Sequence, residues 1–188
     1  MKSARTVNEV ISLVSSGNNP KFLFFWGHKP HLTGEVTKAC FSQWWESPFE
    51  IDGLIFPTAE HYMMWAKSRL FGDITTSQKI MNATHPKQAK ELGRSVIGFV
   101  ETIWLQHRFD IVVTANDAKF RQNPRLSEFL LSTGDRVLVE ASPVDRVWGI
   151  GLAADDVYAN SPKNWRGLNL LGFALMEVRD RLRSSLNQ

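Results

Sequence analysis

The chain has 188 residues, of which 43% are hydrophobic and 22% charged, and its formal net charge is +3. This length supports one domain with a real hydrophobic core, and the mild positive charge permits contact with phosphates or nucleic acid without requiring it. No segment is apolar for long enough to be a transmembrane helix, and the N-terminus lacks the pattern of a secretory signal. The single cysteine, Cys40, excludes an internal disulfide. We therefore expect a cytoplasmic protein that does not enter membranes.

The first predicted element is an N-terminal extension over residues 1–20, weakly structured or helical, that ends at Ser16-Gly17-Asn18. The apolar run at 22–26 then predicts a buried strand, and the polar residues 28–38 predict a loop. His28 and His31 have no matching Cys or His cluster, so a metal site is not expected.

An aromatic cluster at Phe41, Trp44 and Trp45 opens the central stretch of the chain. A hairpin over residues 49–56 follows, because Asp52-Gly53 is the favoured pair for a type I′ turn between two short apolar runs.

Thr58 is a good N-cap, so a helix should begin at the next residue. Its residues Glu60, Met64 and Lys67 share one face, with about 10 Å along the axis between the two charges. A first-turn Glu often only complements the helix dipole, and a helical Lys is often solvated. This helix is apolar nearly all round, however, and a charge on a buried helix needs a partner, a ligand or a cavity.

Helical signals dominate the rest of the chain. Helices are predicted at 75–82, 86–92 (with Gly93 as the stop), 99–119, 124–134 and 170–182, and a strand at 136–140. This order of elements predicts an α+β fold, mainly helical with a few short strands.

The turn-rich segment 142–151 holds Asp145, Trp148 and two glycines, one of them Gly149. Such a loop lets backbone approach a ligand, and it equally suits a tight structural turn with a packed Trp. Seven tryptophans in the chain indicate either a large aromatic core or surfaces on which flat ligands stack. Common phosphate-loop, dinucleotide, zinc and serine-hydrolase motifs are absent, so these residues suggest a pocket for a planar phosphorylated ligand and name no reaction.

Several segments are shared, in order, with one known family. They are FSQWW at 41–45, FPTAEHYMMWAK at 56–67, AKELGR at 89–94, Trp104 with Arg108, KFRQNPRLSEFLLSTGDRVLVEASPVDRVWGIG at 119–151 and WRGLNLLGFALMEVRDRL at 165–182. Together they resemble the NADAR family, which includes the YbiA-like N-glycosidases. The resemblance spans nearly the whole chain after residue 20 and implies a single YbiA-like domain over 21–188.

The resemblance implies a hydrolase that cleaves the bond between a ribose anomeric carbon and nitrogen, with no metal or redox cofactor. Its catalytic positions fall on Glu60, Lys67, Trp104 and Asp145. The expected substrate-binding residues are Phe41, Trp44, Arg94, Trp148, Gly149 and Asn169.

Cleavage of an N-glycosidic bond builds positive charge on the sugar, so a carboxylate such as Glu60 suits the role of base or charge stabiliser. Asp145 would hold the ribose or assist the leaving nitrogen, and Trp104 and Trp148 would stack on the base or sugar. Lys67 has two possible roles, phosphate binding or Schiff-base formation. Arg94 is either a phosphate ligand or a surface cation.

Three functions stay open at this point. The first is an N-glycosidase acting on a ribosylamino-pyrimidine phosphate, an early intermediate of riboflavin synthesis. The second is a hydrolase that removes ADP-ribose from guanine in nucleic acid. The third is a non-catalytic module that binds a nucleotide or ADP-ribose.

Overall fold

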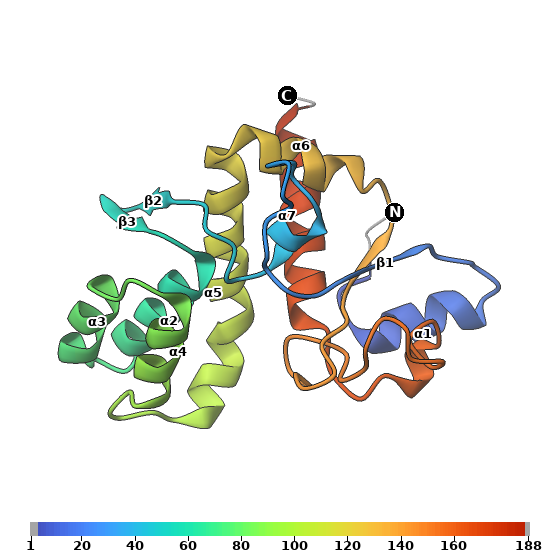
Figure 1. Ribbon diagram of the computed structural model, residues 1–188. Coiled ribbons are helices and arrows are strands. Elements are labelled where there is room, and N and C mark those ends of the chain that lie inside the picture. Colours follow the sequence, from blue (N-terminus) through green and yellow to red (C-terminus); the bar gives the residue numbers. More distant parts are fainter. Residues whose placement is uncertain (1–3, 187–188) are drawn as a thin grey trace. The chain divides into compact units, whose positions relative to one another are not determined.

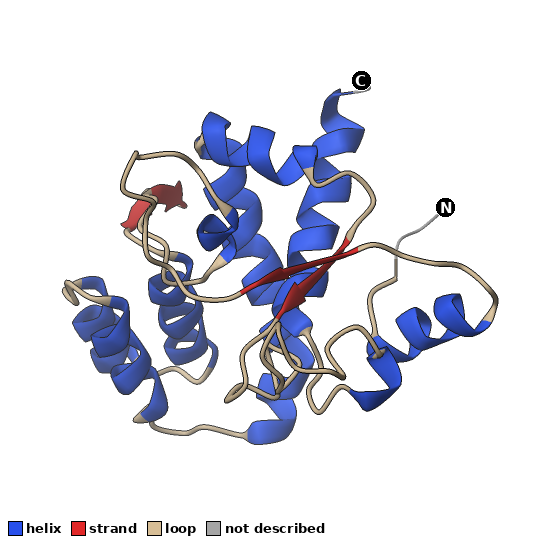
Figure 2. Ribbon diagram, turned by 45° about the vertical axis from the view of Figure 1, so that its right-hand side comes forward, coloured by secondary structure: helices blue, strands red, loops and turns tan. Residues whose placement is uncertain are grey.

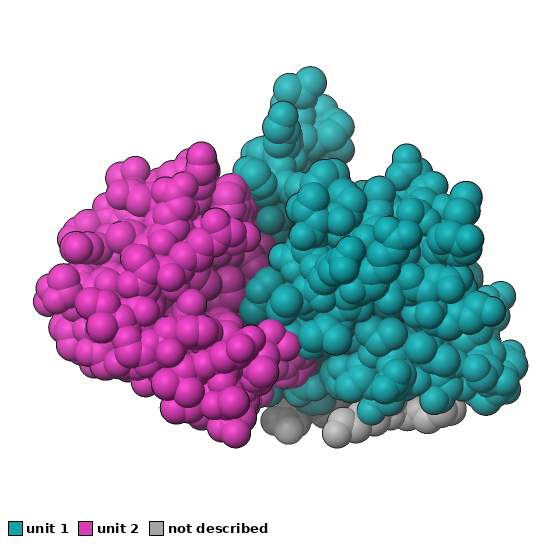
Figure 3. Space-filling view, turned by 90° about the horizontal axis from the view of Figure 1, so that it is seen from below, with its two compact units in different colours: residues 1–42, 125–188 teal, residues 43–124 magenta. Residues whose placement is uncertain are grey.

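The computed structural model describes residues 4–186 and is mainly helical, with four short strands in that range (Figure 1). The chain forms two compact units, coloured separately in Figure 3. Unit 1 comprises residues 1–42 and 125–188, and unit 2 comprises residues 43–124. The predicted α+β class is confirmed. No helix among the described residues combines the length and the apolar character needed to cross a membrane.

Unit 1 contains a two-stranded parallel sheet between β1 (Phe22–Phe25) and β4 (Val137–Glu140), drawn in red in Figure 2. The whole of unit 2 lies between these strands in sequence, so their pairing joins two distant parts of the chain. The helical elements of unit 1 are α1 (Val7–Ser15), η1 (Lys38–Phe41), α6 (Pro124–Ser132, whose first residue closes unit 2), η2 (Pro162–Asn164) and α7 (Leu170–Leu186).

The core of unit 1 forms where β4 packs against α7. Leu171, Leu175, Val178 and Leu182 are buried, as the helical spacing predicts. Their i, i+4, i+7 and i+11 positions lie on one stripe of α7. Phe173, Ala174 and Met176 are buried as well, so the first part of this helix is buried nearly all round.

Unit 2 contains an antiparallel hairpin and four helices. Its elements are β2 (Phe49–Ile51), β3 (Leu54–Phe56), α2 (Ala59–Leu70), α3 (Ile74–Met81), α4 (Pro86–Arg94) and α5 (Glu101–Gln122). Asp52 and Gly53 both have positive φ, 51° and 77°, as a type I′ turn requires. Helix α2 packs against α3, α4 and α5, and Figure 1 shows it among them.

Helix α4 does not stop at Gly93, as the sequence suggested, but continues to Arg94. A Cβ on Gly93 would lie 2.0 Å from Met64 Sδ of α2. The glycine is therefore required by the close approach of two helices, and not by a change of backbone conformation. Helix α7 also runs four residues beyond the predicted end, and in this last turn Arg183 pairs with Asp135 at 2.9 Å and the Ser184 hydroxyl donates to the Asp180 carbonyl.

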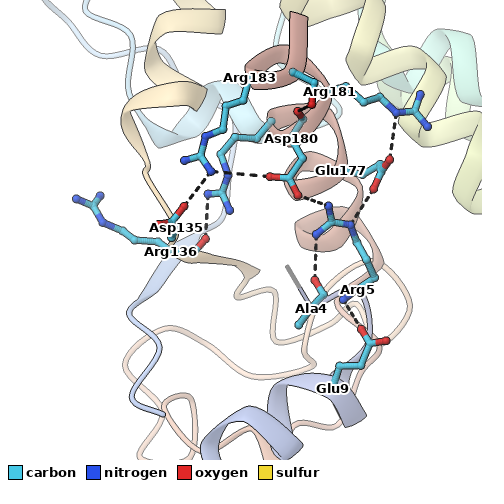
Figure 4. Close-up of polar contacts among 11 residues, drawn as sticks. Ala4, Arg5, Glu9, Asp135, Arg136, Glu177, Asp180, Arg181 and Arg183 are labelled. Carbon is cyan, nitrogen blue, oxygen red and sulfur yellow. Dashed lines mark hydrogen bonds and ion pairs between the residues drawn. The ribbon is translucent and has the colours of Figure 1, made fainter. Parts of the chain in front are cut away.

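Arg5 ties the segment before α1 to helix α7 (Figure 4). Its Nε donates to Glu177 at 2.9 Å and its terminal nitrogen to Asp180 at 2.6 Å. Thr6 and Glu9 form a capping box at the start of α1, which lies in the extension that the sequence predicted to be weakly structured or helical. The Arg5 side chain is 15% exposed, so these bonds are partly shielded from water.

We predict that Arg5→Met, which keeps much of the aliphatic stem, lowers the free energy of unfolding by about 1–3 kcal/mol, because two charge-assisted hydrogen bonds are lost. Arg183→Met is the matched control, since Asp135, its closest partner, is 97% exposed and the loss should stay below about 1 kcal/mol. Urea denaturation measures both variants. Equal losses of unfolding free energy in the two variants would show that the Arg5 ion pairs stabilise the fold no more than the exposed Arg183 pair does.

Candidate functional site

The start of α2 in unit 2 is held by polar contacts from outside the helix. Thr58 is the N-cap, and its hydroxyl accepts from the His61 N–H at 3.4 Å. Glu60, the second residue of the helix, donates its backbone N–H to the Gln43 carbonyl at 3.0 Å. The residue is 3% exposed. The predicted N-cap is confirmed, and a first-turn carboxylate is fixed in a buried setting near the positive end of the helix dipole.

His61 fastens the same turn to the segment after α3. Its Nε2 lies 3.2 Å from the Ala83 carbonyl and its Nδ1 lies 2.8 Å from the Thr58 hydroxyl. Burial lowers the pKa of the His61 imidazole; the bond to Ala83 opposes this shift, and the charge on His85 adds to it. A neutral ring with its proton on Nε2 satisfies both contacts, so His61 joins the first turn of α2 to the backbone at Ala83.

Lys67 lies two turns after Glu60 and is half-buried among aromatic rings. Its Nζ donates to the Gly93 carbonyl at 2.7 Å and lies 4.3 Å from the Phe99 ring centroid and 5.6 Å from that of Trp104. Burial lowers the pKa of the Lys67 ammonium. The structure therefore brings Lys67 and Trp104 together, and it adds Phe99, which the sequence analysis did not select.

Trp44 is half-buried beside α4 in unit 2. Its ring meets His85 edge to face at 6.0 Å, and Lys90 Nζ lies 5.8 Å from its centroid. Arg94, at the end of α4, is exposed, which agrees with either of its two predicted roles. A cation and an imidazole beside an indole suit a flat, anionic ligand.

In unit 1, Asp145 organises the loop after β4. Its Oδ1 accepts from the backbone N–H groups of Val147 and Trp148, both at 2.8 Å, and its own N–H donates to the Ser142 hydroxyl at 3.2 Å. The side chain of Trp148 is half-buried. One carboxylate oxygen of Asp145 thus fixes the turn that carries the tryptophan.

Gly149 allows the loop backbone to pack against the rest of unit 1. A Cβ there would lie 2.7 Å from the Glu140 carbonyl oxygen, and one on Gly167 would lie 2.3 Å from the Gly149 oxygen. The close approach at these glycines is between two stretches of the chain's own backbone. Hydrogen bonds such as Arg166 N–H to Ile150 O at 2.8 Å join the same stretches.

Asn169 and Phe41 also belong to unit 1, and both are fully buried. The Asn169 amide accepts from Glu140 N–H and donates to the Leu138 carbonyl, both at 2.9 Å, so it extends the hydrogen bonding of β4. Its backbone has a φ of 53°, which Asn tolerates better than most residues. Phe41 packs edge to face on Phe25 at 5.4 Å in the core.

The sequence-predicted residues thus divide between the two units. Unit 2 holds Trp44, Glu60, Lys67, Arg94 and Trp104; unit 1 holds Phe41, Asp145, Trp148, Gly149 and Asn169. Sequence reasoning did not select Phe99, Gln43 or Asn116: Gln43 lies in the FSQWW motif, but no local pattern shows that Gln43 and Asn116 meet or that Phe99 lies beside Lys67. Residues 4–186 contain no group of three or more His, Cys, Asp or Glu side chains that could hold a metal ion.

The comparisons with known proteins agree on one family. The model of the NADAR domain matches residues 24–183. N-glycosidase R617 of Acanthamoeba polyphaga mimivirus is 45% identical over 166 residues, which cover 85% of this chain and 95% of that protein. The riboflavin biosynthesis protein PYRR, chloroplastic, of Zea mays is 36% identical over 140 residues, 70% of this chain and 20% of the maize protein.

The NMR structure of the E. coli protein YbiA superposes with a TM-score of 0.72 at 26% identity, over 90% of this chain and 89% of that one. Several of the related proteins carry the name N-glycosidase, and the predicted enzyme class, a hydrolase of N-glycosyl bonds, is confirmed at this level. By its family-model match and by its similarity over most of its length to these proteins, the chain belongs to the NADAR domain family.

Proposed function

We propose that this chain is an N-glycosidase that hydrolyses the ribose–nitrogen bond of a ribosylamino-pyrimidine phosphate, the type of intermediate from which riboflavin is built. The name of the viral relative supports the reaction. The maize relative, of which the match covers 20%, is named for riboflavin biosynthesis, and this name supports the pathway to which the substrate belongs. The observation that carries the proposal is the pairing on α2 of a buried carboxylate, Glu60, with a desolvated amine, Lys67.

Glu60 supplies negative charge for the step that breaks the bond. As the nitrogen leaves, positive charge grows on C1′ of the ribose, and a fixed carboxylate in a buried setting stabilises it strongly. The same carboxylate later accepts a proton from the water that hydrolyses the lysine imine described below. Because the Gln43 carbonyl and the Thr58 cap hold the first turn of α2, the charge is positioned before substrate arrives.

Lys67 acts as the nucleophile on the ring-opened substrate. Its neutral amine adds to C1′ of the sugar imine, and the base leaves as a free amine, so that a lysine imine remains. Water then adds to this imine, which releases the sugar aldehyde and restores Lys67. Desolvation favours this role over phosphate binding, because it raises the fraction of the neutral amine that attacks.

The first test is release of free base from two substrates in parallel, 5-amino-6-ribosylaminouracil 5′-phosphate and a guanine-ADP-ribosylated oligonucleotide. We expect turnover of the first, and a fall of about 10²–10⁴-fold in kcat for Glu60→Gln, because the amide carries no charge. Glu91→Gln changes an exposed carboxylate of α4 in the same way and should keep full activity. Turnover of the oligonucleotide alone would overturn the substrate, and turnover of neither would leave only a binding module.

The second test traps the lysine imine with borohydride during turnover. We expect a sugar phosphate adduct on Lys67, and kcat should rise with pH through the lowered pKa of Lys67, since only the neutral amine attacks. Mass spectrometry after digestion locates the adduct. Lys67→Arg keeps the charge but cannot form an imine, and Lys79→Arg on the exposed face of α3 is the matched control. An active Lys67→Arg enzyme without adduct would assign this residue to phosphate binding instead.

The third test separates the charge of Asp145 from its hydrogen bonds. Asp145→Asn keeps an oxygen for the Val147 and Trp148 N–H groups, so thermal stability should change little, while kcat should fall at least about tenfold if the carboxylate holds the ribose or assists the leaving nitrogen. Asp156 caps a similar turn through Tyr158 N–H at 2.9 Å, so Asp156→Asn is the control. Unchanged kcat in Asp145→Asn would limit this residue to shaping the loop.

A further inference from the structure

Residues 95–100 join α4 to α5 and run past Lys67, and we call this segment the strap. The Lys67 amine contacts the chain on both sides of the middle of the strap. Its Nζ donates to the carbonyl of Gly93, just before the strap, and lies 4.3 Å from the ring centroid of Phe99, within it. Two of the groups that replace water around this amine therefore depend on where the strap lies.

Little apolar packing holds the strap in place. Val96 is buried, but the side chains of Ile97 and Phe99 are 76% and 44% exposed, and Phe99 packs edge to face on Phe71 at 5.3 Å. Gly98 has a φ of 74°, which lets the chain turn between them. Because so much of its apolar surface faces water, the position of the strap depends strongly on its polar contacts.

Asp73, the N-cap of α3, supplies such a contact. Its Oδ2 accepts from the Ile97 N–H and its Oδ1 from the Thr76 N–H, both at 2.9 Å. The Asp73 N–H donates to the carbonyl of Ser68 at 2.9 Å, so the carboxylate is fixed to the end of the helix that carries Lys67. The hydrogen bonds from Ile97 and Thr76 lower the pKa of the Asp73 carboxyl, which is therefore ionised at neutral and alkaline pH.

We propose that Asp73 is a positioning residue for Lys67, on which it acts through the strap. Its bond to Ile97 lies between Gly93 and Phe99 in sequence. One carboxylate oxygen thus fixes both of the groups that this part of the chain brings to the amine. The inference rests on the catalytic role proposed above for Lys67 and adds a residue outside the group that attacks the sugar.

The consequence for Lys67 is a setting with less water. A carbonyl and an aromatic face each favour the ammonium form, but they replace only part of its hydration, so burial still lowers the pKa of Lys67. No ion pair to Lys67 forms within the described part of the chain. Charged residues on the helices around it include Glu60 and Arg69 of α2, Lys79 of α3, Glu91 and Arg94 of α4, and Glu101 and Arg108 of α5.

The sign of the change separates the strap from the charge of Asp73. If the strap is released, water reaches the amine and the pKa of Lys67 should rise toward its ordinary value. Loss of a negative charge alone would act in the opposite direction, because a nearby carboxylate favours the ammonium form. A rise in the pKa of Lys67 after removal of Asp73 therefore reports the strap.

The experiment uses Asp73→Ser, because serine remains a good N-cap for α3 and has no second oxygen for the Ile97 N–H. Lys67 is titrated without substrate, from its rate of acetylation by acetic anhydride over a range of pH, located by mass spectrometry, with exposed Lys79 as the internal reference. We expect the titration of Lys67 to move to higher pH. On the acid limb kcat should fall about threefold to tenfold, and it should recover at alkaline pH, because the amine is neutral there in both proteins.

A second variant tests the same link if Asp73→Ser does not fold. Phe99→Ala removes the ring that the strap brings to Lys67, and it should move the titration in the same direction. The combined effect of the two replacements should be smaller than their sum, since both act through one segment. Ile97→Ala is the control, because it shortens an exposed side chain of the strap and keeps the N–H that Asp73 accepts.

The outcomes separate this inference from the proposed function. A Lys67 titration that is unchanged in folded Asp73→Ser, or that moves to lower pH, overturns the positioning role, and so do additive effects in the double replacement. These results come from labelling and do not require turnover. A titration that moves to higher pH, in a protein without N-glycosidase activity or without an adduct on Lys67, supports positioning by Asp73 and overturns the catalytic role proposed for Lys67.

Discussion

The burial of α2 is the constraint on which unit 2 depends. This helix contacts α3, α4 and α5 and is buried along most of its first two turns, yet it carries Glu60 and Lys67. Burying ionisable groups costs free energy unless hydrogen bonds or aromatic faces replace water. The Gly93 carbonyl and the rings of Phe99 and Trp104 do so for Lys67.

In unit 1, polar side chains that are removed from water are satisfied by backbone groups, where unit 2 uses aromatic rings. The loop at 145–151 runs beside residues 165–171, which include the start of α7; hydrogen bonds join the two segments, and glycines leave room where their main chains meet. Asn169 and Asp145 complete the arrangement by offering side-chain groups to backbone partners. A turn that is held in this way has little conformational freedom.

Turns, helix starts and buried helix faces were predictable because each depends on a few residues that are close in sequence. The type I′ hairpin follows from Asp52-Gly53, the start of α2 from Thr58, and the buried stripe of α7 from its leucine spacing. Gly93 was misread as a helix stop, since a sequence alone does not distinguish a glycine that ends a helix from one that admits a neighbour. The parallel pairing of β1 with β4 was also out of reach, because more than a hundred residues separate the two strands.

By itself, the sequence determined the hairpin, the α-helices to within a few residues, the face shared by Glu60 and Lys67, and, through its long matching segments, the family. Those properties depend on residues within a few turns of one another or on ordered motifs. Only the tertiary structure decided which groups surround that face. The Gln43 and Asn116 side chains meet across 73 positions, and Lys67 reaches a carbonyl 26 positions away. Such contacts arise from the packing of whole helices, which no local pattern of residues encodes.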